Sequence, residues 1–126
     1  MGNIGIAYDF HIHTALSPCA DDDMTPNNIV NMSFLNSLGA IAITDHNSTL
    51  NCRAVSEAGA ARGIIVVPGM ELTSAEEIHV LCLFPDVAAA ERFGALVRAR
   101  LPEIKNRKDI FGRQLVIDSR DEITGE

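Results

Sequence analysis

Residues 40–47, with the sequence AIAITDHN, decide the fold. The apolar run that begins this stretch predicts a buried strand, because a strand covered on both faces carries apolar residues without alternation. Its polar end, Asp45-His46-Asn47, then lies at the carboxyl end of that strand. In sheets of parallel strands, ligands and catalytic groups gather at the carboxyl ends. The stretch therefore predicts an α/β fold and the edge of the sheet where function lies.

A helix is expected on each side of this strand. The first has Thr25 as N-cap and Pro26 at its first position, and it stops at Gly39. The second spans about residues 50–62 and is capped by Ser48 or Thr49. Further strands are expected at residues 4–10, 64–67 and 78–84, a third helix at 87–101, and a small hairpin at 115–117 and 123–124.

The alternation of strands and helices predicts parallel βαβ units with right-handed crossovers. We expect about four parallel strands with their helices, followed by a C-terminal helix and the hairpin. Residues 1–86 would form the first unit, and residues 87–126 an extension from it.

All four histidines of the chain lie next to predicted strands. His11 and His13 follow the first strand, His46 follows the second, and His79 begins the fourth, where only a tight turn would bring it to the same edge. Residues at i and i+2 of an extended segment point to one side, so His11 and His13 can hold one cation. Glu71, beyond the third strand, is the candidate carboxylate that bridges this cation to a second one.

Each of these residues also has an ordinary structural interpretation. Taken singly, Asp45-His46 fits a helix cap with a hydrogen-bonded histidine, Glu71 a surface acid, and His79 a core histidine. The common placement of all of them at strand ends favours a metal cluster. Asp9 is expected to orient an imidazole. Within the acidic loop at residues 21–23, Asp21 is the preferred further ligand, against a merely solvated loop.

The charge of the chain is unevenly distributed. The net charge is −7, and residues 1–91 hold eleven acids against two arginines, a balance of −9. This disfavours a broad basic surface for nucleic acid, although a metal site would supply its own positive charge. A basic stretch of Arg98, Arg100, Lys105, Arg107 and Lys108 fits a solvated helix end better than a nucleic-acid site.

The cysteines and the hydropathy indicate in which cellular compartment the protein is expected. Cys19, Cys52 and Cys82 are odd in number and form no CxxC pair, which is typical of free thiols in a reducing cytosol. No apolar run approaches the roughly 20 residues that a membrane helix needs. We therefore expect a cytoplasmic protein without a membrane partner.

The order and spacing of the motifs resemble the N-terminal half of the PHP (polymerase and histidinol phosphatase) family. The matching segments are DFHIHT at 9–14, MTP at 24–26, ITDHN at 43–47, PGME at 68–71 and IHVL at 78–81. The resemblance implies part of a distorted (β/α)7 TIM-like barrel that binds two or three metal ions. Histidine and carboxylate ligands suit divalent Zn, Mn and Fe alike.

Residue roles follow from the resemblance by motif position. It implies that His11 and His13 bind a first metal, that Glu71 bridges to a second metal bound by His79, and that His46 serves a third with a residue from the loop at 19–23. Family members supply further ligands from a C-terminal half, and this chain has no histidine after His79. A longer polypeptide, or a second copy of the chain, is therefore expected to complete the site.

The leading hypothesis is a hydrolase, a phosphoesterase that cleaves a phosphate ester with a hydroxide held between metals. Asp45 and His46 are its candidate catalytic pair, in which Asp45 tunes a ligand or relays a proton. A small phosphorylated substrate is favoured over nucleic acid. The alternatives are a metal-binding or assembly module without turnover, and a proofreading-type nuclease domain.

Overall fold

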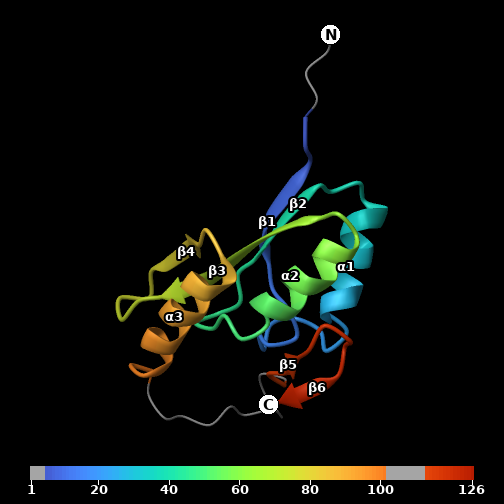
Figure 1. Ribbon diagram of the computed structural model, residues 1–126. Helices are drawn as coiled ribbons and strands as arrows, with labels where there is room; N and C mark the ends of the chain where they lie inside the picture. Colours follow the sequence, from blue (N-terminus) through green and yellow to red (C-terminus); the bar gives the residue numbers. More distant parts are fainter. Residues whose placement is uncertain (1–4, 102–112) are drawn as a thin grey trace.

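The computed structural model describes residues 5–101 and 113–126, and its main sheet has four strands in the order β1-β2-β3-β4 (Figure 1). The strands are β1 Tyr8–Ile12, β2 Ala40–Ile43, β3 Ile65–Thr73 and β4 His79–Leu83. The first three run parallel, as expected. The mixed α/β class is confirmed, and the curled sheet fits part of a TIM-like barrel.

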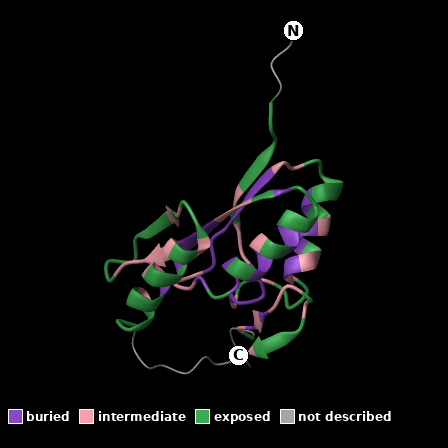
Figure 2. Ribbon diagram, viewed as in Figure 1, coloured by how far each residue is buried: buried purple, intermediate pink, exposed green. Residues whose placement is uncertain are grey.

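Two helices connect the parallel strands and cover one face of the sheet (Figure 1). They are α1, Pro26–Leu35, and α2, Cys52–Ala61. The core between them contains Ile29 and Val30 of α1, Ile41 and Ile43 of β2, and Val55 of α2, all at most 3% exposed. Figure 2 shows these buried segments between the sheet and the helices. Burying each such side chain contributes about 1.5–3 kcal/mol, which explains the uninterrupted apolar run of β2.

The two helices begin differently. Thr25 caps α1 as predicted, because its hydroxyl accepts a hydrogen bond from the Asn28 N–H and Pro26 follows it. The cap predicted for α2 at Ser48 or Thr49 is wrong, since the N-cap residue is Asn51. The Thr49 hydroxyl instead donates to the carbonyl of Ala90, which ties the start of α2 to the next helix.

Strand β4 is antiparallel to β3, so the expectation of four parallel strands is wrong for this strand. The two strands are joined by residues 74–78 alone, and a parallel return needs a crossover of about a dozen residues or more. Glu77 adopts a positive φ of 61° in this turn, and the Ser74 N–H donates to the Ile78 carbonyl. The hairpin places His79 opposite Thr73, close to Glu71. The tight turn that His79 required is therefore present.

The C-terminal region contributes a helix and a hairpin. Helix α3, Val87–Arg98, is capped by Asp86 and is shorter than expected by three residues. The predicted hairpin is confirmed as β5, Val116–Ile117, and β6, Ile123–Gly125. Leu115 and Ile117 pack on Ala15, and all three are buried. The hairpin thus packs against the loop that follows β1.

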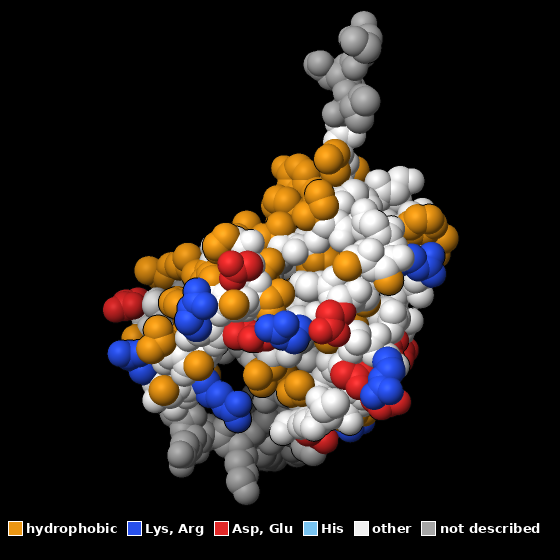
Figure 3. All heavy atoms as spheres, in the orientation of Figure 1, with side chains coloured by type: hydrophobic (Ala, Val, Ile, Leu, Met, Phe, Trp, Pro, Cys, Tyr) orange, Lys and Arg blue, Asp and Glu red, His pale blue; other side chains and the backbone are white. Residues whose placement is uncertain are grey.

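Apolar side chains remain exposed along the outer strands of the sheet. Tyr8 on β1 is 65% exposed, and Val80 and Leu83 on β4 are 47% and 46% exposed. Figure 3 shows apolar side chains gathered at the end of the sheet next to the N-terminus. No helix in the described ranges has both the length and the apolar character to cross a membrane.

Candidate metal centre

The carboxylate of Glu71 lies among the rings of all four histidines. Its Oε2 atom is 2.7 Å from His13 Nε2, 3.2 Å from His11 Nε2 and 3.6 Å from His46 Nε2. Its Oε1 atom is 3.1 Å from His79 Nδ1. The residue is only 7% exposed. Histidines from three segments therefore converge on one buried carboxylate. The strand-end expectation needs correction in detail, because Glu71 lies within β3 and not beyond it, and His11 lies within β1.

The backbone around Glu71 fixes this arrangement. Its N–H donates to the carbonyl of Asp45, and its carbonyl accepts from the N–H of Asn47, so the segment after β2 continues alongside β3. Asn47 has a positive φ of 51°, and its side-chain oxygen accepts from the Thr73 N–H. These bonds turn the chain directly after His46 and hold that residue beside the carboxylate.

Among residues 5–101 and 113–126, three groups of side chains have ligand atoms close enough to hold one ion each. Within each group the candidate atoms all lie within 4.8 Å of one another. The groups are His11-His13-Glu71, His46-Glu71-His79 and His13-Cys19-His46. The first two share Glu71.

The electrostatics favour an ionised Glu71 beside a neutral His46. Burial opposes ionisation of Glu71, but hydrogen bonds with His79, His11 and His13 outweigh it and lower the pKa to about 2. Burial, together with the neighbouring charge of His13, lowers the pKa of His46. At neutral pH Glu71 is therefore an anion and His46 a neutral imidazole, the forms in which both residues bind metals.

Asp45 is placed behind the cluster. Its buried carboxylate accepts hydrogen bonds from the N–H and hydroxyl of Thr14 and from the hydroxyl of Ser17, each at 2.7 Å. Burial raises its pKa, and these hydrogen bonds act in the opposite direction. Ser17 Oγ in turn accepts from the backbone N–H of His46. Asp45 thus fastens the loop after β1 to the start of the segment that carries His46.

The remaining two candidate residues, Asp9 and Asp21, lie near His11 without contacting its ring. The carboxylate of Asp9 accepts from the backbone N–H of His11 at 3.0 Å. Asp21 is exposed and lines, with His11 and His13, a cavity of about 450 Å³. The residue of this loop that contacts a histidine is Cys19, whose Sγ is 3.2 Å from His13 Nδ1. The sequence had placed an expected ligand in the loop at residues 19–23, with Asp21 preferred, and Cys19 lies in that loop six residues after His13.

No family model matches the chain. In sequence it is similar to the 5'-3' exoribonuclease Rnm of Salmonella typhimurium, with 33% identity over 91 residues, and to that of Escherichia coli K12, with 31% over 90 residues. Each match covers 68% of this chain and 30% of the relative. The chain therefore spans about a third of the length of these relatives.

Two solved structures share the fold. One, from Bifidobacterium adolescentis and provisionally classed as a metal-dependent phosphoesterase, has a TM-score of 0.60 and 24% identity, over 76% of this chain and 33% of that one. The other, an amidohydrolase from Chromobacterium violaceum with bound sulfate and no metal, has a TM-score of 0.53 and 30% identity, over 74% and 36%.

By their names these neighbours and relatives are all hydrolases, and the two solved structures share the fold of this chain. More particularly, the resemblance found in the sequence is confirmed as a similarity: the chain is similar to PHP-type proteins in sequence, over the part that it shares with the exoribonuclease Rnm, and in fold.

Proposed function

We propose that this chain carries the metal centre of a phosphoesterase that depends on divalent metal ions. The observation that carries the proposal is the buried Glu71 carboxylate with the nitrogens of His11, His13, His46 and His79 within 3.6 Å. A buried carboxylate that meets four imidazoles is rare as a purely structural feature, and it is the donor set of a borderline divalent cation.

The donors fit two or three ions. Glu71 presents one carboxylate oxygen to His11 and His13 and the other to His79, so it can serve one ion on each side. Nitrogen and carboxylate ligands suit Zn, Mn and Fe alike. We propose His11, His13, His46, Glu71 and His79 as ligands, with Asp21 as a further oxygen ligand from the cavity that it lines.

Bound divalent ions would polarise a phosphate ester and make a water nucleophilic at neutral pH. The side chains of Glu71, His46 and Asp45 have separate roles around such ions. Glu71 stays ionised because of its low pKa, and it supplies the negative charge that holds cations in place. His46 is neutral and borders both this cluster and an adjacent 510 Å³ cavity, so the free nitrogen of its ring can bind an ion or accept a proton. Asp45 acts through His46, whose backbone it positions by way of Ser17.

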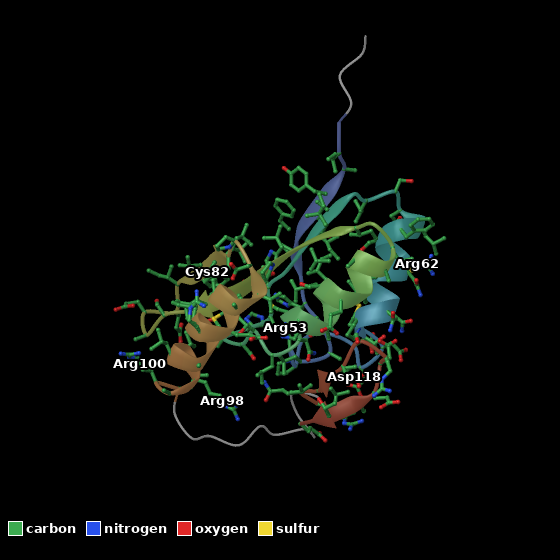
Figure 4. All side chains as sticks on the ribbon, viewed as in Figure 1. Arg53, Arg62, Cys82, Arg98, Arg100 and Asp118 are labelled. Carbon is green, nitrogen blue, oxygen red and sulfur yellow. The ribbon has the colours of Figure 1, made fainter. Side chains whose placement is uncertain are left out.

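A small phosphate ester is the first candidate substrate, because the surface of the chain is acidic. Removal of nucleotides from RNA is the second, and the two sequence relatives, both 5'-3' exoribonucleases, favour it. Arg98 and Arg100 project near the C-terminal end of α3 (Figure 4) and supply part of the predicted basic stretch. The others, Lys105, Arg107 and Lys108, lie outside the described residues.

The barrel assignment is also a proposal. The outer strands β1 and β4 have exposed apolar side chains, which suits a sheet that pairs with further strands. We propose that residues 1–86 form part of a distorted (β/α)7 barrel, with residues 87–126 as an extension that is completed by further chain or by a second copy.

The function is tested by assaying phosphate release from a generic aryl phosphate and mononucleotide release from a 5'-phosphorylated RNA oligonucleotide. Each assay is run with Zn, Mn or Fe and with the His11→Ala, His13→Ala double variant. Turnover of either substrate that requires metal and is lost in the variant supports the proposal and identifies the substrate class. Metal binding without turnover of any ester would favour the alternative, a binding or assembly module.

A further inference from the structure

Asn51 stands at the start of α2, but its side chain does not cap that helix. Asparagine is among the best N-cap residues, because its side-chain oxygen accepts from the free N–H groups of the first turn. Here the residue is fully buried, and its side chain bonds to the loop after β1 and to the C-terminal hairpin instead. We propose that Asn51 is a positioning residue of the metal centre, which it reaches through Thr14 and Asp45. The inference rests on the proposed function, because it concerns the same centre.

The side chain of Asn51 uses both of its amide hydrogens and its oxygen in these contacts. Its Nδ2 donates to Oγ1 of Thr14 at 3.0 Å and to the carbonyl of Leu115 at 2.9 Å. Its Oδ1 accepts from the N–H of Ile117 at 2.9 Å. A primary amide has two hydrogens to donate, so both are used. The side chain is therefore fixed in one orientation, by the loop on one side and by β5 on the other.

Thr14 passes this constraint on to Asp45. Its hydroxyl donates to Oδ2 of Asp45 at 2.7 Å, and it accepts from Asn51 and from the N–H of Leu16. A hydroxyl has one proton and two lone pairs, so all three positions are occupied. The N–H of Thr14 donates to the other carboxylate oxygen, Oδ1. The hydroxyl cannot turn without breaking a buried hydrogen bond.

The network ends at the backbone of two of the proposed ligands. Thr14 directly follows His13, and Asp45 directly precedes His46. The N–H of His46 donates to Oγ of Ser17, which donates to Oδ1 of Asp45. The rings of His13 and His46 lie 4.5 Å apart between their centroids. Hydrogen-bond partners behind metal ligands orient those ligands, so a loosened network should weaken metal binding.

The hairpin of β5 and β6 holds the other side of Asn51 in place. The N–H of Leu115 donates to the carbonyl of Ala15 at 2.9 Å, and Leu115 and Ile117 pack on Ala15. Figure 1 shows the hairpin next to the loop after β1. If β5 opened, Asn51 would lose two of its three buried hydrogen bonds. The hairpin is therefore coupled to the metal centre, although the side chains of β5, Val116 and Ile117, carry no ligand atom.

Coupling of this kind acts in both directions with the same factor. If the closed hairpin strengthens metal binding, a bound ion must also stabilise the closed hairpin. The loss of a hydrogen-bond partner behind a metal ligand weakens metal binding by about 10–100-fold. Asn51 acts through Thr14 and Asp45, so its removal should weaken binding by about tenfold, the lower end of that range.

The first test titrates the chain with Co²⁺ and follows its visible d–d absorption, whose shape depends on how the ligands are arranged. The variants are Asn51→Ala, Thr14→Val and Thr14→Ser, with Val30→Ala as a control that destabilises only the core between α1 and the sheet. We expect an altered spectrum and about a tenfold loss of affinity in Asn51→Ala and Thr14→Val. Thr14→Ser keeps the hydroxyl and should restore both, and Val30→Ala should keep the affinity and spectrum of the wild type.

The second test uses the wild type, so it stands even where a substitution prevents folding. Hydrogen exchange is measured with and without Zn²⁺ at the Ile117 amide, which donates to Asn51. We expect the bound ion to slow this exchange by about tenfold, the same factor as the loss of affinity. In Thr14→Val, where the network is cut, the ion should leave the rate unchanged.

An unchanged Co²⁺ affinity in Asn51→Ala, or a wild-type Ile117 amide whose exchange does not respond to Zn²⁺, would overturn the inference and leave the proposed function standing. Asn51 would then only hold the hairpin to the fold. A wild type that takes up neither ion would overturn the proposed function as well, so the two failures are distinguishable.

Discussion

His13 Nε2 lies 2.7 Å from Oε2 of Glu71, although 58 residues separate the two along the chain. The contact exists because β1 and β3 run parallel on either side of β2, so their carboxyl ends meet at the same edge of the sheet. Hydrogen bonds from His79, His11 and His13 lower the pKa of Glu71 to about 2, so the acid stays ionised at this edge of the sheet.

Removing the carboxylate of Asp45 should destabilise the fold. The Asp45→Ala variant leaves the Thr14 N–H and two hydroxyls without their acceptor, and unsatisfied buried groups cost about 1–3 kcal/mol each. We expect a loss of about 2–4 kcal/mol in the free energy of unfolding, measured by urea denaturation. The control Asp22→Ala, which removes an exposed contact to Arg113, should change it by less than about 0.5 kcal/mol.

Asn51 joins the C-terminal hairpin to the same buried network. Its amide nitrogen donates to Thr14 Oγ1 and to the Leu115 carbonyl, and its oxygen accepts from the Ile117 N–H. The Asn51→Ala variant should lose about 2–3 kcal/mol of stability and expose β5. Hydrogen exchange should then quicken at the Ile117 amide and stay unchanged within β2. Equal protection of Ile117 in both proteins would contradict this role.

Asp121 joins the hairpin to the start of α1. Its carboxylate accepts from the Thr25 hydroxyl at 2.7 Å and from the Asn27 N–H at 2.9 Å. An acid at a helix N-terminus also interacts favourably with the helix dipole, so Asp121→Ala should cost about 1 kcal/mol in thermal or urea unfolding. Glu122→Ala removes only an exposed contact with Arg120 and should cost nothing measurable. Equal effects of the two substitutions would refute the assignment.

The stability of the metal-free chain should depend on pH through Glu71. The folded pKa of about 2 lies below the ordinary value of 4.5, so the ionised carboxylate stabilises the fold above about pH 4.5. This contribution is lost as the pH falls from 4.5 toward 2. The difference in unfolding free energy between the wild type and Glu71→Gln should therefore shrink between pH 5 and pH 3. The exposed Glu76→Gln serves as the control, and a difference that does not vary with pH would be evidence against the assignment.

Much of the sheet was predictable from the sequence because its signals are local. The apolar run of β2, the Thr25-Pro26 start of α1 and the hairpin at 115–124 each depend on neighbouring residues. The direction of β4 was not predicted correctly, although the five residues between β3 and β4 are too few for a crossover. The short connection between β3 and β4 indicates an antiparallel pair, whereas the alternation of strands and helices suggested a parallel one.

The site was predictable in its residues but less so in its contacts. His13 and His46 follow the ends of parallel strands, which meet at one edge of the sheet. His79 reaches Glu71 through the antiparallel hairpin, which the spacing alone did not predict. The choice between Cys19 and Asp21 depends on how the loop turns back at Ala20, and the fastening of Asp45 depends on hydroxyls far away in sequence. Both follow from tertiary packing, which residue spacing does not encode.

The most direct measurement is the metal content of the chain purified without chelator, determined by elemental analysis. The comparison is between the wild type, the His11→Ala, His13→Ala double variant, and Arg53→Ala as a control that removes only the exposed contact with Glu91. We expect two or more Zn, Mn or Fe ions per chain in the wild type and the control, and a clear loss in the double variant. A wild type that holds no metal and takes up none on titration would contradict the assignment of Glu71 and the four histidines as a metal centre.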